Sequence, residues 1–73
     1  MTLEMSDALR MTLLKELMFG KEIWDHEYRN EIYMMYDFGL IKVYDQNLEF
    51  AATTELGIEE LHKLIKLYFV FLN

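Results

Sequence analysis

The sequence predicts a single α+β domain, mostly helical, that spans residues 1–73. Apolar residues recur at helical spacing in the first half of the chain and again near its end. Two short segments rich in β-branched and aromatic residues lie between these regions. Proline is absent, and the three glycines separate the segments. We therefore expect two or three helices, then a two-stranded β-hairpin, then a closing helix.

A first helix is predicted ahead of Gly20. Ser6 or Thr2 would cap its N-terminus, because a hydroxyl accepts a hydrogen bond from a free N–H of the first turn. Gly20 follows Phe19 and suits the left-handed stop at a helix end. A buried stripe with the spacing of one helix face consists of Leu9, Leu13, Leu14, Leu17 and Met18.

The segment from Lys21 to Phe38 is also helical in pattern, and Gly39 ends it. Asn30 would cap a new helix, so the segment is interpreted either as one helix or as two helices with a turn near residues 26–30. The residues expected on one buried face are Trp24, Tyr28, Ile32 and Met35.

A β-hairpin is predicted at about residues 40–44 and 48–53. Both segments are rich in aliphatic and aromatic residues, and the intervening Asp45-Gln46-Asn47 has good turn chemistry, because Asn and Asp tolerate positive φ. A two-stranded hairpin is marginally stable alone, so its apolar face must lie on the helices.

A closing helix is predicted at about residues 54–72, capped by Thr53 or Thr54. Gly57 falls in its first turn, where it would weaken the helix by up to ~1 kcal/mol relative to alanine. The last turns are apolar nearly all round, which one buried face does not accommodate. We expect them to form a homodimer interface through Tyr68, Phe69, Val70, Phe71 and Leu72.

Two stretches resemble the winged helix-turn-helix domains of MarR-like and PadR-like regulators. Ile32, Met35 and the triplet Gly39-Leu40-Ile41 resemble the end of a recognition helix that runs into the first wing strand. Residues 50–57, followed by Ile58 and Leu61, resemble the second strand and the "LT-x-x-G" opening of the last helix. The resemblance covers about residues 7–66. It implies a winged-helix fold and a dimeric DNA-binding regulator that reads the duplex with Arg29, Asn30, Tyr33 and Lys42.

The charge balance favours a protein partner over DNA. Thirteen acidic residues against seven basic ones give a formal charge of −6, whereas affinity for nucleic acid comes largely from cations that neutralise phosphates. The would-be recognition segment carries Glu27, Glu31 and Asp37. We expect these three to form an acidic, partner-binding face. In one version the protein is a small phage-type inhibitor whose carboxylates imitate nucleic-acid phosphate.

The sequence contains no pattern typical of an enzyme. It has no cysteine, only two histidines, and no nucleophile elbow, glycine-rich phosphate loop or HExxH. Glu22 with His26, and Glu59 with His62, have helical spacing for a metal pair, but we interpret them as surface residues of acidic helices. We therefore expect no catalysis, cofactor, metal or small-molecule substrate.

Aromatic and methionine residues form two further candidate groups. Five aromatic residues suit a core and interface role, with a base-stacking platform as the alternative: Trp24, Tyr28, Tyr33, Tyr36 and Tyr44. The methionines suit adaptable packing in the core, or a partner groove as the alternative: Met11, Met18, Met34 and Met35.

A cytoplasmic, non-membrane protein is expected. The longest apolar run, Leu67 to Leu72, is too short for a bilayer span. Glu4 and Asp7 stand where a signal peptide would carry basic residues. The lack of cysteine fits a reducing compartment.

Overall fold

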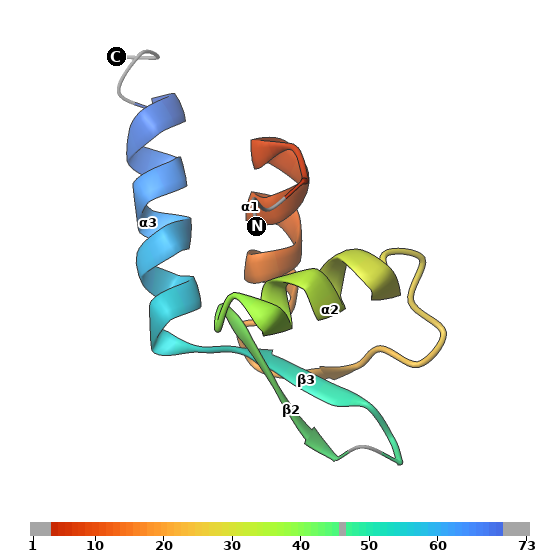
Figure 1. Cartoon of the computed structure of the whole chain (residues 1–73). Helices are drawn as coiled ribbons and strands as arrows, with labels where there is room; N and C mark the ends of the chain where they lie inside the picture. The colour runs from red at the N-terminus through yellow and green to blue at the C-terminus, as the bar shows by residue number, and fades with distance from the viewer. Residues whose placement is uncertain (1–3, 46, 70–73) are drawn as a thin grey trace.

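The computed structural model describes residues 4–45 and 47–69, and these form an α+β domain of three helices and a three-stranded antiparallel sheet (Figure 1). About half of the described residues are helical. The elements in chain order are α1 (Asp7–Glu16), β1 (Lys21–Glu22), α2 (Arg29–Asp37), β2 (Ile41–Asp45), β3 (Phe50–Thr53) and α3 (Glu55–Phe69). The predicted α+β class is confirmed.

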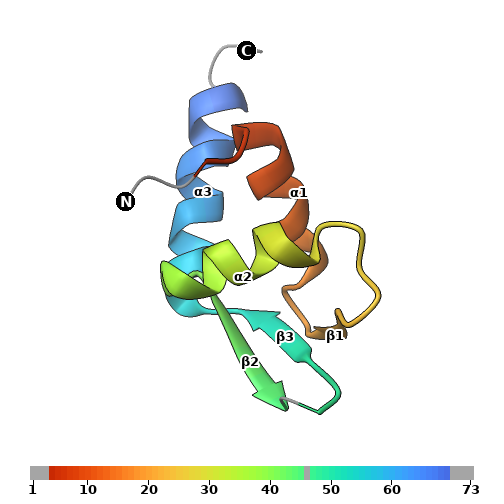
Figure 2. The ribbon, with the colours of Figure 1, turned by 45° about the vertical axis from the view of Figure 1, so that its right-hand side comes forward.

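The helices and the sheet lie in separate parts of the molecule. α1 and α3 stand side by side, α2 lies across the end of α1, and the hairpin of β2 and β3 extends away from the helices (Figures 1 and 2). The helices α1 and α2 and the strands β2 and β3 all contribute to one core, and α3 contributes Leu61. The buried apolar residues of that core are Leu13, Leu14, Leu17, Ile23, Ile32, Met35, Leu40, Ile41, Ala51 and Leu61.

The interpretation of residues 21–38 as fully helical is wrong. Lys21 and Glu22 form a short strand that pairs with Ala51 and Phe50 of β3, so the sheet order is β1-β3-β2. Residues 23–28 form turns, in which the N–H of His26 donates to the carbonyl of Ile23 at 3.0 Å. Pairing with a distant strand therefore overrides the local helical pattern.

A single helix, α2, follows these turns, so neither alternative, one helix over residues 21–38 or two helices within them, is correct. Ile32 and Met35 are fully buried, as the predicted stripe requires. Trp24 and Tyr28 precede the helix and are 61% and 36% exposed, so they do not share its buried face. Gly39 ends the helix at φ 78°, the left-handed conformation predicted for a glycine stop.

The predicted hairpin forms with slightly shifted bounds. β2 starts one residue later than expected and β3 two residues later, and the pairing slips by one residue between Val43 and Asp45. Asp45 stabilises the turn, because its carboxylate accepts from the N–H groups of Asn47 at 2.9 Å and Leu48 at 3.3 Å. Leu48, expected in a strand, lies in the turn and is 53% exposed.

Thr53 and Thr54 have different functions at the junction of β3 with α3. Thr54 is the cap: its hydroxyl oxygen accepts from the N–H of Gly57 at 3.1 Å. Thr53 instead serves α1, since its hydroxyl donates to the Leu14 carbonyl at 2.7 Å and its N–H donates to the Leu17 carbonyl at 2.9 Å. β3 thus satisfies carbonyls at the C-terminal end of α1 that lack helical partners.

We expect Thr53→Val to destabilise the protein by about 1–3 kcal/mol, because it leaves the Leu14 carbonyl without its hydroxyl donor in a buried place. The free energy of unfolding from urea titration measures this loss. Thr12→Val is the matched control, since the Thr12 hydroxyl bonds the Ala8 carbonyl on an exposed helix face. Equal losses in the two variants would contradict the function assigned to Thr53.

Gly57 lies where α3 begins, against the chain segment that follows α2. A Cβ atom built at Gly57 would lie 2.2 Å from the Leu40 carbonyl oxygen and 2.6 Å from Cγ2 of Thr53. The N–H of Thr54 also donates to the Leu40 carbonyl, at 3.0 Å. The glycine that helix propensity marks as a weakness therefore permits close packing of α3 on the rest of the fold.

Candidate interaction surface

Arg29, the first residue of α2, is held by the turn between β2 and β3. Its Nε donates to Oε2 of Glu49 at 2.7 Å, and a terminal guanidinium nitrogen donates to the other oxygen of the same carboxylate. Glu49 takes φ 49°, a left-handed conformation unusual for a non-glycine residue. The guanidinium also lies 5.0 Å from the ring centre of Tyr33.

The two charges shift each other's protonation in the directions expected of a paired site. The hydrogen bond to Glu49 raises the pKa of Arg29, and the hydrogen bond from Arg29 lowers the pKa of Glu49. Burial first, and the Glu49 carboxylate second, raise the pKa of Tyr33. Arg29, Tyr33 and Glu49 therefore form one cluster, which links the hairpin turn to α2.

Because of this cluster, we expect the folded protein to lose stability in acid. Because the native pKa of Glu49 lies below its ordinary value of 4.5, the ion pair contributes its full stability above that pH and loses it as pH falls through the lower native pKa. We expect Glu49→Gln to reduce the loss of unfolding free energy between pH 7 and pH 3, as measured by urea titration at each pH. Glu27→Gln changes an exposed carboxylate that pairs with no described residue and should leave that difference unchanged.

Two of the four residues implied for DNA contact, Arg29 and Tyr33, are thus engaged in contacts within the protein. Asn30 and Lys42 are exposed, on α2 and β2 respectively. The Lys42 ammonium lies 4.7 Å from the ring centre of Tyr44 on the same strand. Arg29, the only permanent cation of the would-be recognition segment, is fully matched by a carboxylate of this chain.

The three acidic residues predicted to form one face are spread out. Glu27 is exposed in the turn before α2, Glu31 is partly buried, and Asp37 is exposed at the helix end. At 100° per residue, Glu31 and Asp37 lie about 120° apart around the helix axis. The fold does not gather these carboxylates on one side of α2.

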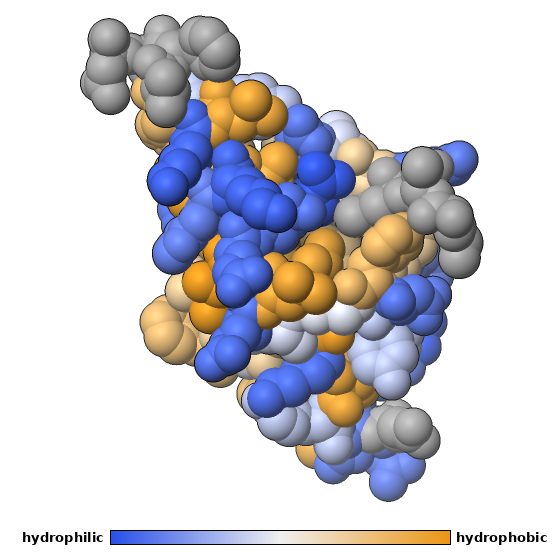
Figure 3. All heavy atoms as spheres, turned by 60° about the vertical axis from the view of Figure 1, so that its left-hand side comes forward, coloured by the Kyte–Doolittle hydropathy of each residue, from blue (hydrophilic) through white to orange (hydrophobic). Residues whose placement is uncertain are grey.

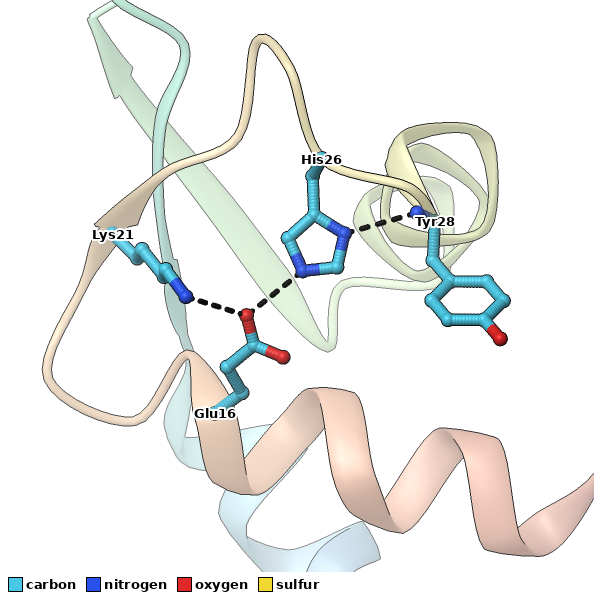
Figure 4. Close-up of polar contacts among 4 residues, drawn as sticks. All are labelled: Glu16, Lys21, His26 and Tyr28. Carbon is cyan, nitrogen blue, oxygen red and sulfur yellow. Dashed lines mark hydrogen bonds and ion pairs between the residues drawn. The ribbon is translucent and has the colours of Figure 1, made fainter.

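His26 serves a structural function at the end of α1 (Figure 4). Its Nε2 lies 2.8 Å from Oε2 of Glu16, which also accepts from Lys21 Nζ at 2.9 Å. Its Nδ1 accepts from the N–H of Tyr28 at 2.9 Å, so a neutral ring protonated on Nε2 satisfies both contacts. Burial raises the pKa of Glu16, but the hydrogen bonds from Lys21 and His26 lower it overall.

These contacts fix the turns of residues 23–28 on α1 and leave neither ring nitrogen of His26 free for a metal ion. Glu22, which has helical spacing to His26 in the sequence, lies exposed on β1. Over residues 4–45 and 47–69, no group of three or more His, Cys, Asp or Glu side chains is placed to hold a metal ion.

An apolar surface lies along α1 and α3. A groove between these helices contains Met11, Met18, Ile65 and Phe69, with Lys15 and His62 at its rim. A second hollow, toward the hairpin, shares Met18 and adds Phe19 and Ile58. Phe19 is 95% exposed, beside the glycine that ends the α1 turn. We call the apolar residues of these two hollows, Met11, Met18, Phe19, Ile58, Ile65 and Phe69, the apolar strip.

The predicted interface at the chain end overlaps this strip in part. Phe69 belongs to it and is 52% exposed. Tyr68 instead turns toward α1, where its hydroxyl donates to Oδ2 of Asp7 at 2.7 Å. Val70, Phe71 and Leu72 lie outside the described residues. Sequence reasoning assigned Met11 and Met18 to the core, with a partner groove as the alternative, and missed Phe19, whose position next to Gly20 is the only local sign.

The opposite flank of α3 has a different character. It carries Leu56 and Leu67, each 52% exposed, among charged neighbours such as Glu60 and Lys63. Figure 3 shows that charged side chains and apolar patches are mixed on the face that carries this helix. The apolar surface on this flank is interrupted by charged side chains.

No model of a known protein family, no curated protein and no solved structure matches this chain. None of the described helices is long and apolar enough to cross a membrane.

Proposed function

We propose that this protein is a small, non-enzymatic regulatory module of the cytoplasm that acts through protein contacts. It forms a homodimer through the apolar strip and presents α2 and the hairpin to a macromolecular partner. The observation that carries this proposal is the strip itself: large apolar side chains exposed or partly exposed along two adjoining hollows, which water does not favour and a second protein surface would cover.

In this proposal the fold is a shortened winged helix. The support comes from the sheet order β1-β3-β2, from α2 running through Gly39 into β2, and from α3 closing the domain after β3. One helix lies between β1 and β2 where a helix-turn-helix has two. The turns of residues 23–28 take the place of the missing helix.

A dimeric DNA-binding regulator is the second candidate. Exposed Asn30 on α2 and Lys42 on β2 favour it, because an amide and an ammonium are the groups that contact base edges and phosphates. The Glu49 carboxylate weighs against it, because it already occupies the guanidinium of Arg29. The version in which carboxylates imitate phosphate has less support, since Glu31 and Asp37 diverge around α2.

Two measurements on the intact chain separate these candidates. Light scattering over a concentration series should give a mass that rises from one chain to two. A mobility-shift titration with duplex DNA should show no complex even at low salt. A monomer at every accessible concentration would overturn the homodimer. A DNA complex that weakens steeply with salt would favour the second candidate.

A further inference from the structure

The ring of His26 connects the end of α1 to the start of α2 (Figure 4). Its Nε2 lies 2.8 Å from Oε2 of Glu16 on α1, and its Nδ1 accepts from the N–H of Tyr28, which directly precedes α2, at 2.9 Å. Lys21 of β1 donates to the same Glu16 oxygen at 2.9 Å. The His26 side chain is only 12% exposed, so the ring is held mainly by these protein groups.

The contact at Nδ1 takes the place of a helix cap. The first N–H groups of a helix have no partner within the helix, and a side chain commonly accepts from one of them. Tyr28 occupies the cap position of α2, but its own side chain accepts no such hydrogen bond. Instead Nδ1 of His26 accepts the N–H of Tyr28, and the His26 carbonyl accepts the N–H of Arg29 at 3.1 Å. His26 therefore satisfies the first two N–H groups at this helix end.

Only the neutral ring of His26 can form this cap. A protonated histidine carries a hydrogen on both ring nitrogens and has no acceptor. Its Nε2–H would still donate to the Glu16 carboxylate, and the added charge would strengthen that hydrogen bond. The new Nδ1–H, however, would face the N–H of Tyr28. Protonation therefore keeps the bond to α1 and removes the bond to α2.

The charges around the ring act in both directions. The Glu16 carboxylate favours the protonated ring, whereas the positive N-terminal end of α2 and the Lys21 ammonium on the same carboxylate oxygen oppose it. Asp25 and Glu27 are exposed neighbours in the chain, and within the described residues neither pairs with His26. Burial raises the pKa of Glu16, but the hydrogen bonds from Lys21 and His26 lower it overall, so this carboxylate stays ionised near neutral pH.

We propose that His26 is a pH-dependent cap: the neutral ring holds the start of α2 on α1, and the protonated ring releases it. Histidine is the side-chain type that changes charge between about pH 5 and pH 8. The released helix end stays tied to the hairpin turn, because Arg29 bonds Glu49, and Ile32 stays buried in the core. The change is therefore confined to the turns of residues 23–28 and the first turn of α2. This inference does not depend on the proposed homodimer.

Nuclear magnetic resonance of the natural chain tests the proposal from about pH 8 to about pH 5. The ring nitrogen signals of His26 report its protonation, and hydrogen exchange reports the protection of the Tyr28 N–H, corrected for the intrinsic effect of pH on exchange. This protection should fall about fivefold as the ring gains its proton, the factor that corresponds to one hydrogen bond of ordinary strength. Amides in the interior of α2 should keep their protection.

Two variants separate His26 from the rest of the chain. In His26→Asn the side-chain oxygen can accept the N–H two residues later, as in an Asx turn, and the amide is neutral at every pH. The protection of the Tyr28 N–H should then be the same at both ends of the titration. His62→Asn is the matched control, because it removes the other histidine, which is exposed on α3, and should leave the pH response unchanged.

The proposal is overturned if the protection of Tyr28 stays constant while the His26 ring gains its proton, or if the ring stays neutral throughout the titration. A response that persists in His26→Asn, or that disappears in His62→Asn, would also overturn it. The titration of the natural chain needs no variant, so it decides the matter even if His26→Asn does not fold. Light scattering measures the oligomeric state separately, so failure of the homodimer and failure of the cap are distinguishable.

Discussion

Gly57→Ala should destabilise the protein by about 3 kcal/mol, a large share of the stability of so short a domain. Helix propensity alone predicts the opposite, a gain of up to ~1 kcal/mol, because alanine is the better helix former. The tertiary contact decides the sign. The new methyl group would meet the Leu40 carbonyl oxygen at 2.2 Å, and this oxygen belongs to the backbone and is fixed by its hydrogen bond from Thr54.

The free energy of unfolding from guanidinium titration measures the effect. Gly39→Ala is the matched control, because its Cβ would find only a Leu56 methyl at 3.5 Å. That variant should lose only about 1 kcal/mol, from the left-handed backbone that Gly39 adopts. A Gly57→Ala protein as stable as the natural chain would show that α3 moves away from Leu40 at little cost.

Ile65→Asp should raise the dissociation constant of the homodimer about thirtyfold, the effect of roughly 2 kcal/mol. Ile65 lies in the middle of the groove between α1 and α3 and is 39% exposed, so the substitution removes apolar contact from the strip. It also places a carboxylate where a partner surface would exclude water, which is costly for an unpaired charge. Sedimentation equilibrium measures the change.

Leu67→Asp is the matched control for charge and for lost hydrophobicity. Leu67 lies two residues further along α3, about 160° away around the axis, on the flank outside the strip. The Leu67→Asp substitution should leave the dimer intact. If Leu67→Asp dissociates the dimer and Ile65→Asp does not, the interface lies on the flank with Leu56 and the apolar strip has been wrongly assigned as the dimer surface.

The elements predicted correctly are those specified by short-range interactions. Ser6 caps α1 by accepting from the N–H of Leu9 at 3.1 Å, and Asp45 organises the hairpin turn two and three residues away. Gly39 stops α2 in the left-handed conformation that only its own residue type adopts at low cost. Each of these signals lies within four residues of the structure it determines, so the sequence displays it directly.

The features that the sequence did not reveal depend on partners far away in the chain. Arg29 bonds Glu49, which lies twenty residues later in the chain. The strand at Lys21 exists because β3 lies beside it, and Thr53 bonds a carbonyl thirty-nine residues away. No local pattern distinguishes these residues from others of the same type.

The sequence by itself determined the class of the domain, the apolar face of α1, the buried Ile32 and Met35 of α2, and the turns that connect the later elements. Only the tertiary structure decided that Lys21 and Glu22 join the sheet, that Arg29 is paired with Glu49 within the chain, and that apolar side chains are left exposed at α1 and α3. The physical reason is the range of the forces. Helix periodicity, caps and turns act over one or two turns of chain, whereas strand pairing, ion pairing and exposure depend on which distant segments the fold brings together.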